Sequence, residues 1–264
     1  MAPAILPTVF VSHGAPTLPL EQGEPAREFL TTLGGRYTGV RAVLCVSAHW
    51  NTPRPAVNLA EYPQTIHDFW GFPSDLYRIT YPAPGSEELA TRAADLVESA
   101  GLPCDRDPGR GLDHGTWVPL MLMYPEAGVP VVQLSIQGHL DPGRHLALGE
   151  AIAPLRKEGV LILGSGGAVH PLGDPTVSLG PGVPTSDWAI AFNDWLTRVL
   201  ATGDTKSLAA YRSLAPAAEH AQHYPDHFMP LLVACGAAGK RSTGTVLHQS
   251  WYWGNLGMGA WEFR

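Results

Sequence analysis

The sequence predicts an α/β fold: a single domain with a central mixed or parallel sheet flanked by helices. Short apolar, β-branched segments are interspersed along the chain with longer segments in which apolar residues recur at helical spacing. The 25 prolines and 29 glycines concentrate between these segments, as is typical of loops. No repeat, low-complexity tract or shift of composition divides the chain, so the domain is expected to span residues 1–264.

Five strands are expected, each from a short apolar run bounded by turn-forming residues. They are Ile5–Val11, Ala42–Ser47, Val129–Ile136, Val160–Gly164 and Thr245–Trp251.

Five helices are expected between and after these strands. They are Pro25–Leu33, Ser86–Ala100, Pro142–Glu158, Asp187–Ala201 and Phe228–Ala238. Ser86 followed by two glutamates is typical of a helix start, and Gly101 of a helix end. Thr185-Ser186-Asp187 similarly precedes a stripe of aromatic and aliphatic residues at helical spacing.

Composition excludes several classes of protein. Hydrophobic residues make up 45% of the chain and charged residues 16%, which allows a large core. The net charge of −7, without a basic run, argues against nucleic acid or an anionic membrane as partner. No signal peptide or membrane-spanning run is recognisable, and the three widely spaced cysteines favour reduced thiols in a core. A cytoplasmic protein, monomeric or a small homo-oligomer, is expected.

Histidines stand at the ends of the predicted strands, where α/β sheets bind their ligands. His13 and His49 follow the first two strands, and His170 closes a glycine-rich segment after the fourth. His114 lies in a turn before an apolar helix-like run, and His227 stands just before the last helix. Neutral imidazoles from separate strand ends can converge on Zn, Fe, Cu or Ni, so a metal site is predicted.

Several neighbours of these histidines have predicted roles. Either Asp226 or the local backbone is expected to orient His227, and Asp113 either orients His114 or is only a turn residue. Glycines 164, 166 and 167 are expected to let the backbone approach a ligand closely. His139 and His145 are interpreted as surface residues. The long segment from Asn51 to Ser86 is expected to cover or line a site.

A set of short motifs in this order resembles one family. The motifs are SHGAP, VSAHW, TIHDFWGFP, YPAPGS, LDHGTWVPL, VVQLSI, GSGGAVH and DHFMPLL. Together they resemble the class III extradiol ring-cleavage dioxygenases, in the branch named for 4,5-DOPA dioxygenase. The resemblance covers nearly the whole chain. It implies an α/β domain that cleaves a catechol such as DOPA with O2 to a semialdehyde.

The resemblance also implies roles for individual histidines. His13, His49 and His227 match metal ligands, with Fe(II) as the working metal and Zn(II) the candidate in the isolated protein. His170 matches a metal ligand in one branch of the family and an acid–base residue in another, and both readings stay open. His114 matches an active-site histidine close to the substrate. Histidine titrates in the range that proton transfer at neutral pH requires, so His114 and His170 are the catalytic candidates.

Further expectations concern the pocket. Residues 67–70 and Phe72 form either an aromatic wall for a planar ring or ordinary loop packing. The chain departs from the family pattern at His223-Tyr224-Pro225 and at Gly254-Asn255-Leu256-Gly257-Met258. If the latter segment lines the pocket, substrate preference differs from that for DOPA. Two alternatives stay open: a zinc-dependent hydrolase, and a Memo-like non-enzymatic binding protein of the same fold.

Overall fold

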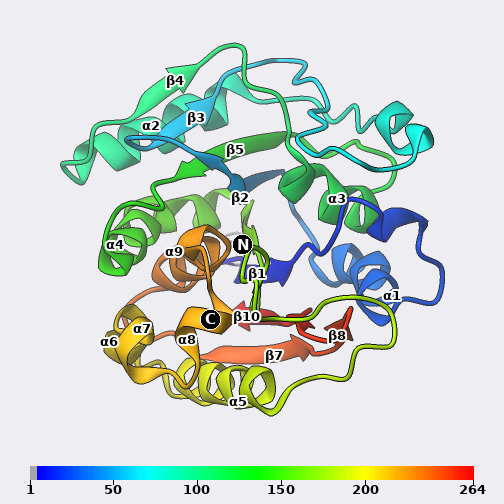
Figure 1. Ribbon diagram of the computed structural model, residues 1–264. Helices are drawn as coiled ribbons and strands as arrows, with labels where there is room; N and C mark the ends of the chain where they lie inside the picture. Colours follow the sequence, from blue (N-terminus) through cyan, green and yellow to red (C-terminus); the bar gives the residue numbers. More distant parts are fainter. Residues whose placement is uncertain (1–4) are drawn as a thin grey trace.

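The computed structural model describes residues 5–264, and its centre is one mixed sheet of eight strands. The strand order is β4-β3-β5-β2-β6-β1-β10-β7, from top to bottom in Figure 1. The strands are β1 (Thr8–Ser12), β2 (Ala42–Asn51), β3 (Ala56–Asn58), β4 (Asp105–Asp107), β5 (Val131–Ile136), β6 (Val160–Gly166), β7 (Gly244–His248) and β10 (Ala260–Phe263). The predicted α/β fold with a mixed sheet is confirmed.

The central strands β5, β2, β6 and β1 run parallel, whereas β10 pairs antiparallel with β1, and β7 pairs antiparallel with β10. Parallel strands are buried on both faces, so neighbouring residues face different cores. In β1, Phe10 packs in one hydrophobic core, and Val9 and Val11 pack in the other. This double burial explains why the strand sequences are continuously apolar instead of alternating.

Helices cover both faces of the sheet (Figure 1). One core is shared with α2 (Glu87–Ser99), α4 (Pro142–Ile152), α5 (Asp187–Thr202) and α9 (Met229–Ala238). The other core is shared with α1 (Pro25–Leu33) and α3 (His114–Met123). Three short helices connect α5 to the last part of the chain: α6 (Thr205–Ala209), α7 (Tyr211–Leu214) and α8 (Ala218–Ala221).

The local signals for helix ends are largely confirmed. The Ser86 side chain accepts a hydrogen bond from the backbone N–H of Leu89 and caps α2. Ser186 precedes α5 as predicted but makes no capping hydrogen bond with its side chain. All three cysteines are buried free thiols, as expected. In the part of the chain that is described, no helix is long and apolar enough to cross a membrane.

Other predictions about elements are wrong. The predicted helix Pro142–Glu158 is α-helical only to Ile152, because Pro154 lacks a backbone donor and the chain continues as the 3-10 helix η4 (Ala153–Glu158). The predicted strand Thr245–Trp251 ends at His248. Trp251 belongs instead to a separate hairpin of β8 (Trp251–Tyr252) and β9 (Leu256–Gly257). The short strands β3, β4 and β10 were not predicted.

His145 is not a surface residue. Only 1% of it is exposed, and its Nε2 accepts a hydrogen bond from the backbone N–H of Gln137 at 3.2 Å. His145 lies on the side of α4 that faces the core. His139 is exposed, as predicted.

Candidate metal centre

Three imidazoles meet where the parallel strands end. His13 follows β1, His49 lies near the end of β2, and His227 lies in the 3-10 helix η5 (Pro225–Phe228), which leads into α9. The Nε2 atom of His49 lies 3.1 Å from Nε2 of His13 and 3.2 Å from Nε2 of His227. The sequence predicted that these residues converge, and the structure brings them together.

Hydrogen bonds on the other ring nitrogens fix which nitrogen of His13 carries the proton. The hydroxyl of Ser165 donates to the carbonyl of Gly115, so its oxygen is free to accept. His13 Nδ1 lies 3.0 Å from this oxygen and therefore donates to it. The lone pair of His13 is left on Nε2, the atom that faces His49.

The Nδ1 atom of His49 also faces a polar partner. It lies 3.4 Å from a carboxylate oxygen of Asp68, an ion-pair contact and not a hydrogen bond. The Nε2 atoms of His49 and His13, 3.1 Å apart, are close enough to bind one cation side by side.

The residues therefore fit a metal ion. Burial is the main cause that lowers the pKa of His13, His49 and His227 well below the ordinary value, so all three are neutral ligands. Nitrogens bound at about 2.0–2.1 Å to one ion lie about 2.8–3.4 Å apart, from octahedral to tetrahedral geometry. The two measured separations fall in that range.

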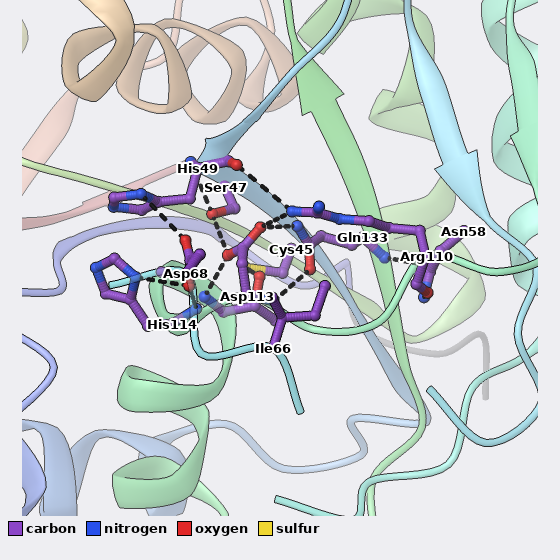
Figure 2. Close-up of polar contacts among 12 residues, drawn as sticks. Cys45, Ser47, His49, Asn58, Ile66, Asp68, Arg110, Asp113, His114 and Gln133 are labelled. Carbon is purple, nitrogen blue, oxygen red and sulfur yellow. Dashed lines mark hydrogen bonds and ion pairs between the residues drawn. The ribbon is translucent and has the colours of Figure 1, made fainter. Parts of the chain in front are cut away.

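His114 is the first residue of α3 and stands close to the same group. Ligand nitrogens of His13, His49 and His114 all lie within 4.8 Å of one another, so His114 belongs to a second three-histidine set able to hold a metal. Its Nδ1 lies 2.9 Å from Asp68, and its backbone N–H donates to the same oxygen at 3.0 Å. Figure 2 shows the Asp68 carboxylate between the rings of His49 and His114.

The expectation that Asp113 orients His114 is wrong, because Asp113 faces away from the ring. Asp113 caps α3 by accepting from the backbone N–H of Thr116, and it is fully buried. Its oxygens also accept from Ser47, Arg110 and Gln133 (Figure 2). This network ties the end of β2, which carries His49, to the start of α3, which carries His114.

The expectation that Asp226 orients His227 is also wrong, because the Asp226 carboxylate accepts a hydrogen bond from the side chain of Asn51 at 3.0 Å. The close neighbour of the His227 ring is His170, stacked on it at 3.5 Å with the planes 6° apart. Burial lowers the pKa of His170 to about 4, so it is neutral. Within residues 5–264, the buried Nδ1 of His170 has no hydrogen-bond partner.

Gly164 and Gly166 within β6 allow close packing, and Gly166 and Gly167 also line the cavity beside the histidines. A Cβ on Gly166 would lie 2.1 Å from the carbonyl oxygen of His227, and one on Gly164 would lie 2.3 Å from that of Pro230. The backbone N–H of Gly167 donates to the His227 carbonyl at 2.9 Å. Glycine at these positions lets η5 and α9 lie directly on β6 and so places His227.

A cavity of about 310 Å³ opens onto these histidines. Phe69, Trp70 and Phe72 line it, as the aromatic-wall interpretation of the long loop expects, whereas His67 does not. Leu256, Gly257 and Met258 also line it, so the C-terminal departure from the family pattern reaches the pocket. His223 is not among the lining residues, and its ring packs on Tyr224.

Comparison with known proteins identifies the family. Residues 7–263 match the family model described as the catalytic LigB subunit of aromatic ring-opening dioxygenase. The chain belongs to this family. Dioxygenases of this family use a non-haem metal, and the substrates of such an enzyme are an aromatic small molecule and O2.

Individual relatives agree with the family assignment. The chain is 46% identical to the 4,5-DOPA dioxygenase extradiol of Beta vulgaris over 97% of its own length and 96% of that protein. It is 35% identical to the 4,5-DOPA dioxygenase extradiol of Escherichia coli K12, with 98% and 94% covered. The crystal structure of an uncharacterized E. coli K12 protein superposes with a TM-score of 0.80 at 31% identity, covering 97% of this chain and 99% of that one. The chain is accordingly a ring-cleaving dioxygenase of the extradiol type.

Sequence reasoning missed two residues of the site. The sequence indicates Asp68 only as part of an aromatic loop segment. The signal for a role in the site is that this acidic residue lies between His67 and Phe69 in a loop predicted to line the site. Arg110, which pairs with buried Asp113, gave no signal, because its partner lies three residues away in an irregular segment.

Proposed function

We propose that this protein cleaves the ring of a catechol such as DOPA with O2, by extradiol cleavage to a semialdehyde, and that Fe(II) is the working metal. The observation that carries the proposal is the convergence of His13, His49 and His227 through Nε2 atoms 3.1 and 3.2 Å apart, at the bottom of an aromatic-lined cavity. The names of the relatives, 4,5-DOPA dioxygenase extradiol, support a catechol as the substrate.

In this proposal His13, His49 and His227 hold the metal. Bound Fe(II), with three neutral ligands and open positions, supplies an uncompensated positive charge for the two catechol oxygens and the electrons that activate O2. Burial of the three imidazoles keeps them neutral and available as ligands.

The other two histidines move protons. His114 donates Nδ1–H to Asp68, so its Nε2 is the free nitrogen that takes a proton from a catechol hydroxyl. His170 lines the same cavity and is neutral, with its Nδ1 unpaired, so it is placed to give or take a proton beside His227. Its alternative role as a further metal ligand is the second reading, which elemental analysis of a His170→Ala variant decides.

The aromatic side chains orient the ring. Phe69, Trp70 and Phe72, together with Trp253 and Met258, offer planar and polarisable surfaces to a catechol. The cavity volume of about 310 Å³ is that of a site for a single small aromatic molecule.

The experiment is anaerobic loading of the metal-free protein with Fe(II), followed by a catechol and air-saturated buffer. We expect O2 uptake equal to the catechol consumed and a yellow semialdehyde product. Protein loaded with Zn(II) is the control and should give neither. Absence of O2 uptake with L-DOPA, 4-methylcatechol and 3,4-dihydroxyphenylacetate alike contradicts the proposal.

A further inference from the structure

Asp68 contacts two histidines that have different tasks in the proposed site. One oxygen of its carboxylate, Oδ1, accepts from the backbone N–H of His114 at 3.0 Å and lies 2.9 Å from Nδ1 of that ring. The other oxygen, Oδ2, lies 3.4 Å from Nδ1 of His49 (Figure 2). Asp68 comes from the loop that follows β3, whereas His49 belongs to β2 and His114 to α3.

The carboxylate acts as a hydrogen-bond acceptor in this position. Its Oδ1 accepts from the backbone N–H of His114, a group that can only donate. The His114 Nδ1, 2.9 Å from the same oxygen, therefore carries its proton. His49 Nδ1 faces the other oxygen of the same carboxylate at 3.4 Å.

We infer that Asp68 is a positioning residue that sets the tautomers of His49 and His114 together. By holding both rings as Nδ1–H, it leaves a lone pair on Nε2 of each: on His49 to bind a metal, on His114 to accept a proton. The two rings come from different elements, so a residue that contacts both is needed to set them together. One carboxylate thus prepares a metal ligand and a proton acceptor at once.

Asparagine at position 68 separates this role from simple packing. It has the same shape, but only one of its two terminal atoms accepts hydrogen bonds, and the other donates. The Asn oxygen is expected to remain on the two N–H groups of His114. Its NH₂ group then faces His49 Nδ1, which can accept only if the proton of His49 moves to Nε2, the atom that faces the metal.

The first measurement uses ¹⁵N-labelled, metal-free protein and long-range ¹H–¹⁵N correlation spectra, which report the protonated nitrogen of each histidine. In the unaltered protein, His49 and His114 should both be Nδ1–H. In Asp68→Asn, His49 should change to Nε2–H while His114 stays Nδ1–H. An Nε2–H state of either ring in the unaltered protein, or an unchanged His49 in Asp68→Asn, overturns the inference.

The second measurement is Zn²⁺ affinity, by competition with a chromophoric chelator. Asp68→Asn should weaken it about 10–100-fold, as is usual when the residue that holds a metal-bound imidazole is altered. Affinity within twofold of the unaltered protein contradicts the inference.

The matched control is Asp174→Asn, which breaks the pair of Asp174 and His220 outside the site, where the carboxylate lies 2.7 Å from Nδ1. It should change the state of His220 only and leave Zn²⁺ affinity unaltered. The inference about Asp68 rests on the proposed metal centre, and the experiments distinguish the two. If the metal-centre proposal is wrong, His13→Ala will not change Zn²⁺ affinity. If only the role of Asp68 is wrong, the contradiction will appear in the Asp68→Asn spectra alone.

Discussion

At the scale of single residues, the chemistry of the site depends on which ring nitrogen each neighbour engages. Ser165 accepts from Nδ1 of His13 because its own hydroxyl proton is committed to the Gly115 carbonyl. Asp68 accepts from Nδ1 and from the backbone N–H of His114, and its other oxygen faces Nδ1 of His49 at 3.4 Å. Hydroxyl and carboxylate, on different elements, direct the lone pairs of three rings into one space.

The substitutions His114→Phe and His227→Phe form a matched pair that assigns the third ligand. We expect His227→Phe to lower metal affinity by more than about 100-fold, since loss of a ligand exceeds loss of its supporting contact. His114→Phe should retain the metal and lower turnover by about 10²–10⁴-fold, because a proton acceptor is removed. Elemental analysis and O2 uptake measure the two effects.

The opposite pattern contradicts this assignment. Loss of metal in His114→Phe with retention in His227→Phe would make His114 the third ligand of the set formed with His13 and His49. Exposed His139, replaced by Phe, is the control and should change neither quantity.

His145 makes stability depend on pH. Burial lowers its pKa to about 4, whereas the unfolded chain has the ordinary value of 6.5. Below pH 6.5 His145 binds a proton in the unfolded state but stays unprotonated in the folded state. The free energy of unfolding therefore falls as the pH decreases towards 4. His145→Gln keeps an acceptor for the Gln137 N–H but does not titrate. Relative to this variant, the unaltered protein should lose about 2 kcal/mol between pH 7.5 and pH 5.

Urea unfolding of the metal-free proteins at both pH values measures this difference. The other buried histidines are common to the two proteins and cancel in the comparison. A difference between the two proteins that does not change with pH would contradict the prediction.

At the scale of elements, the contact between β6 and η5 decides where His227 lies. Gly166 leaves no room for a Cβ, which would lie 2.1 Å from the His227 carbonyl oxygen. The neighbouring Gly167 N–H holds the same carbonyl at 2.9 Å. A metal ligand on a short 3-10 helix is thus fixed by the backbone of a central strand.

Gly166→Ala tests this contact. The added methyl group must push η5 away from β6, which is expected to cost about 1–3 kcal/mol of stability, as overpacking usually does. It should also lower metal affinity, because His227 moves with η5. Gly128→Ala is the control, since a Cβ there meets nothing within 4 Å. Chemical denaturation and elemental analysis measure the two effects, and a Gly166→Ala protein with normal metal content contradicts the account.

At the scale of the whole molecule, negative charge extends into the cavity. The chain has a net charge of −7, and none of the described residues that line the cavity is a lysine or arginine. Asp68 is the one lining side chain with a carboxylate. A substrate carboxylate would lose its water there and meet no counter-charge from the protein.

Catechols with neutral substituents should accordingly react best. We expect kcat/KM for 4-ethylcatechol to exceed that for 3,4-dihydroxyphenylacetate by about tenfold or more, which corresponds to about 1.4 kcal/mol. L-DOPA, whose ammonium group balances its carboxylate, should lie between them. Equal values for the neutral and anionic catechols would contradict this expectation.

The accuracy of prediction from the sequence follows from how local each signal is. The apolar runs of β1, β2, β5 and β6 and the Ser86 cap depend on neighbours in sequence, and they were predicted correctly. Strand β10 has four residues, and only its pairing with β1, far away in sequence, makes it a strand.

The site shows the same division. Strand ends indicated His13 and His49, and the resemblance to a family indicated His227. The partner of His114 could not be found in this way, because sequence adjacency favoured Asp113 and the fold instead supplies Asp68 from a loop 46 residues away. Burial of His145 likewise depends on which side of α4 meets the core.

The pairing of β1 with β10 also bears on how the protein is made. Thr8 lies opposite Phe263, so β1 cannot gain its second neighbour until the ribosome has synthesised the chain through β10. Until then one edge of β1 is open, and His13, which follows it, lacks a fixed position. Assembly of the metal site is therefore expected to wait for the synthesis of β10, about 250 residues after His13.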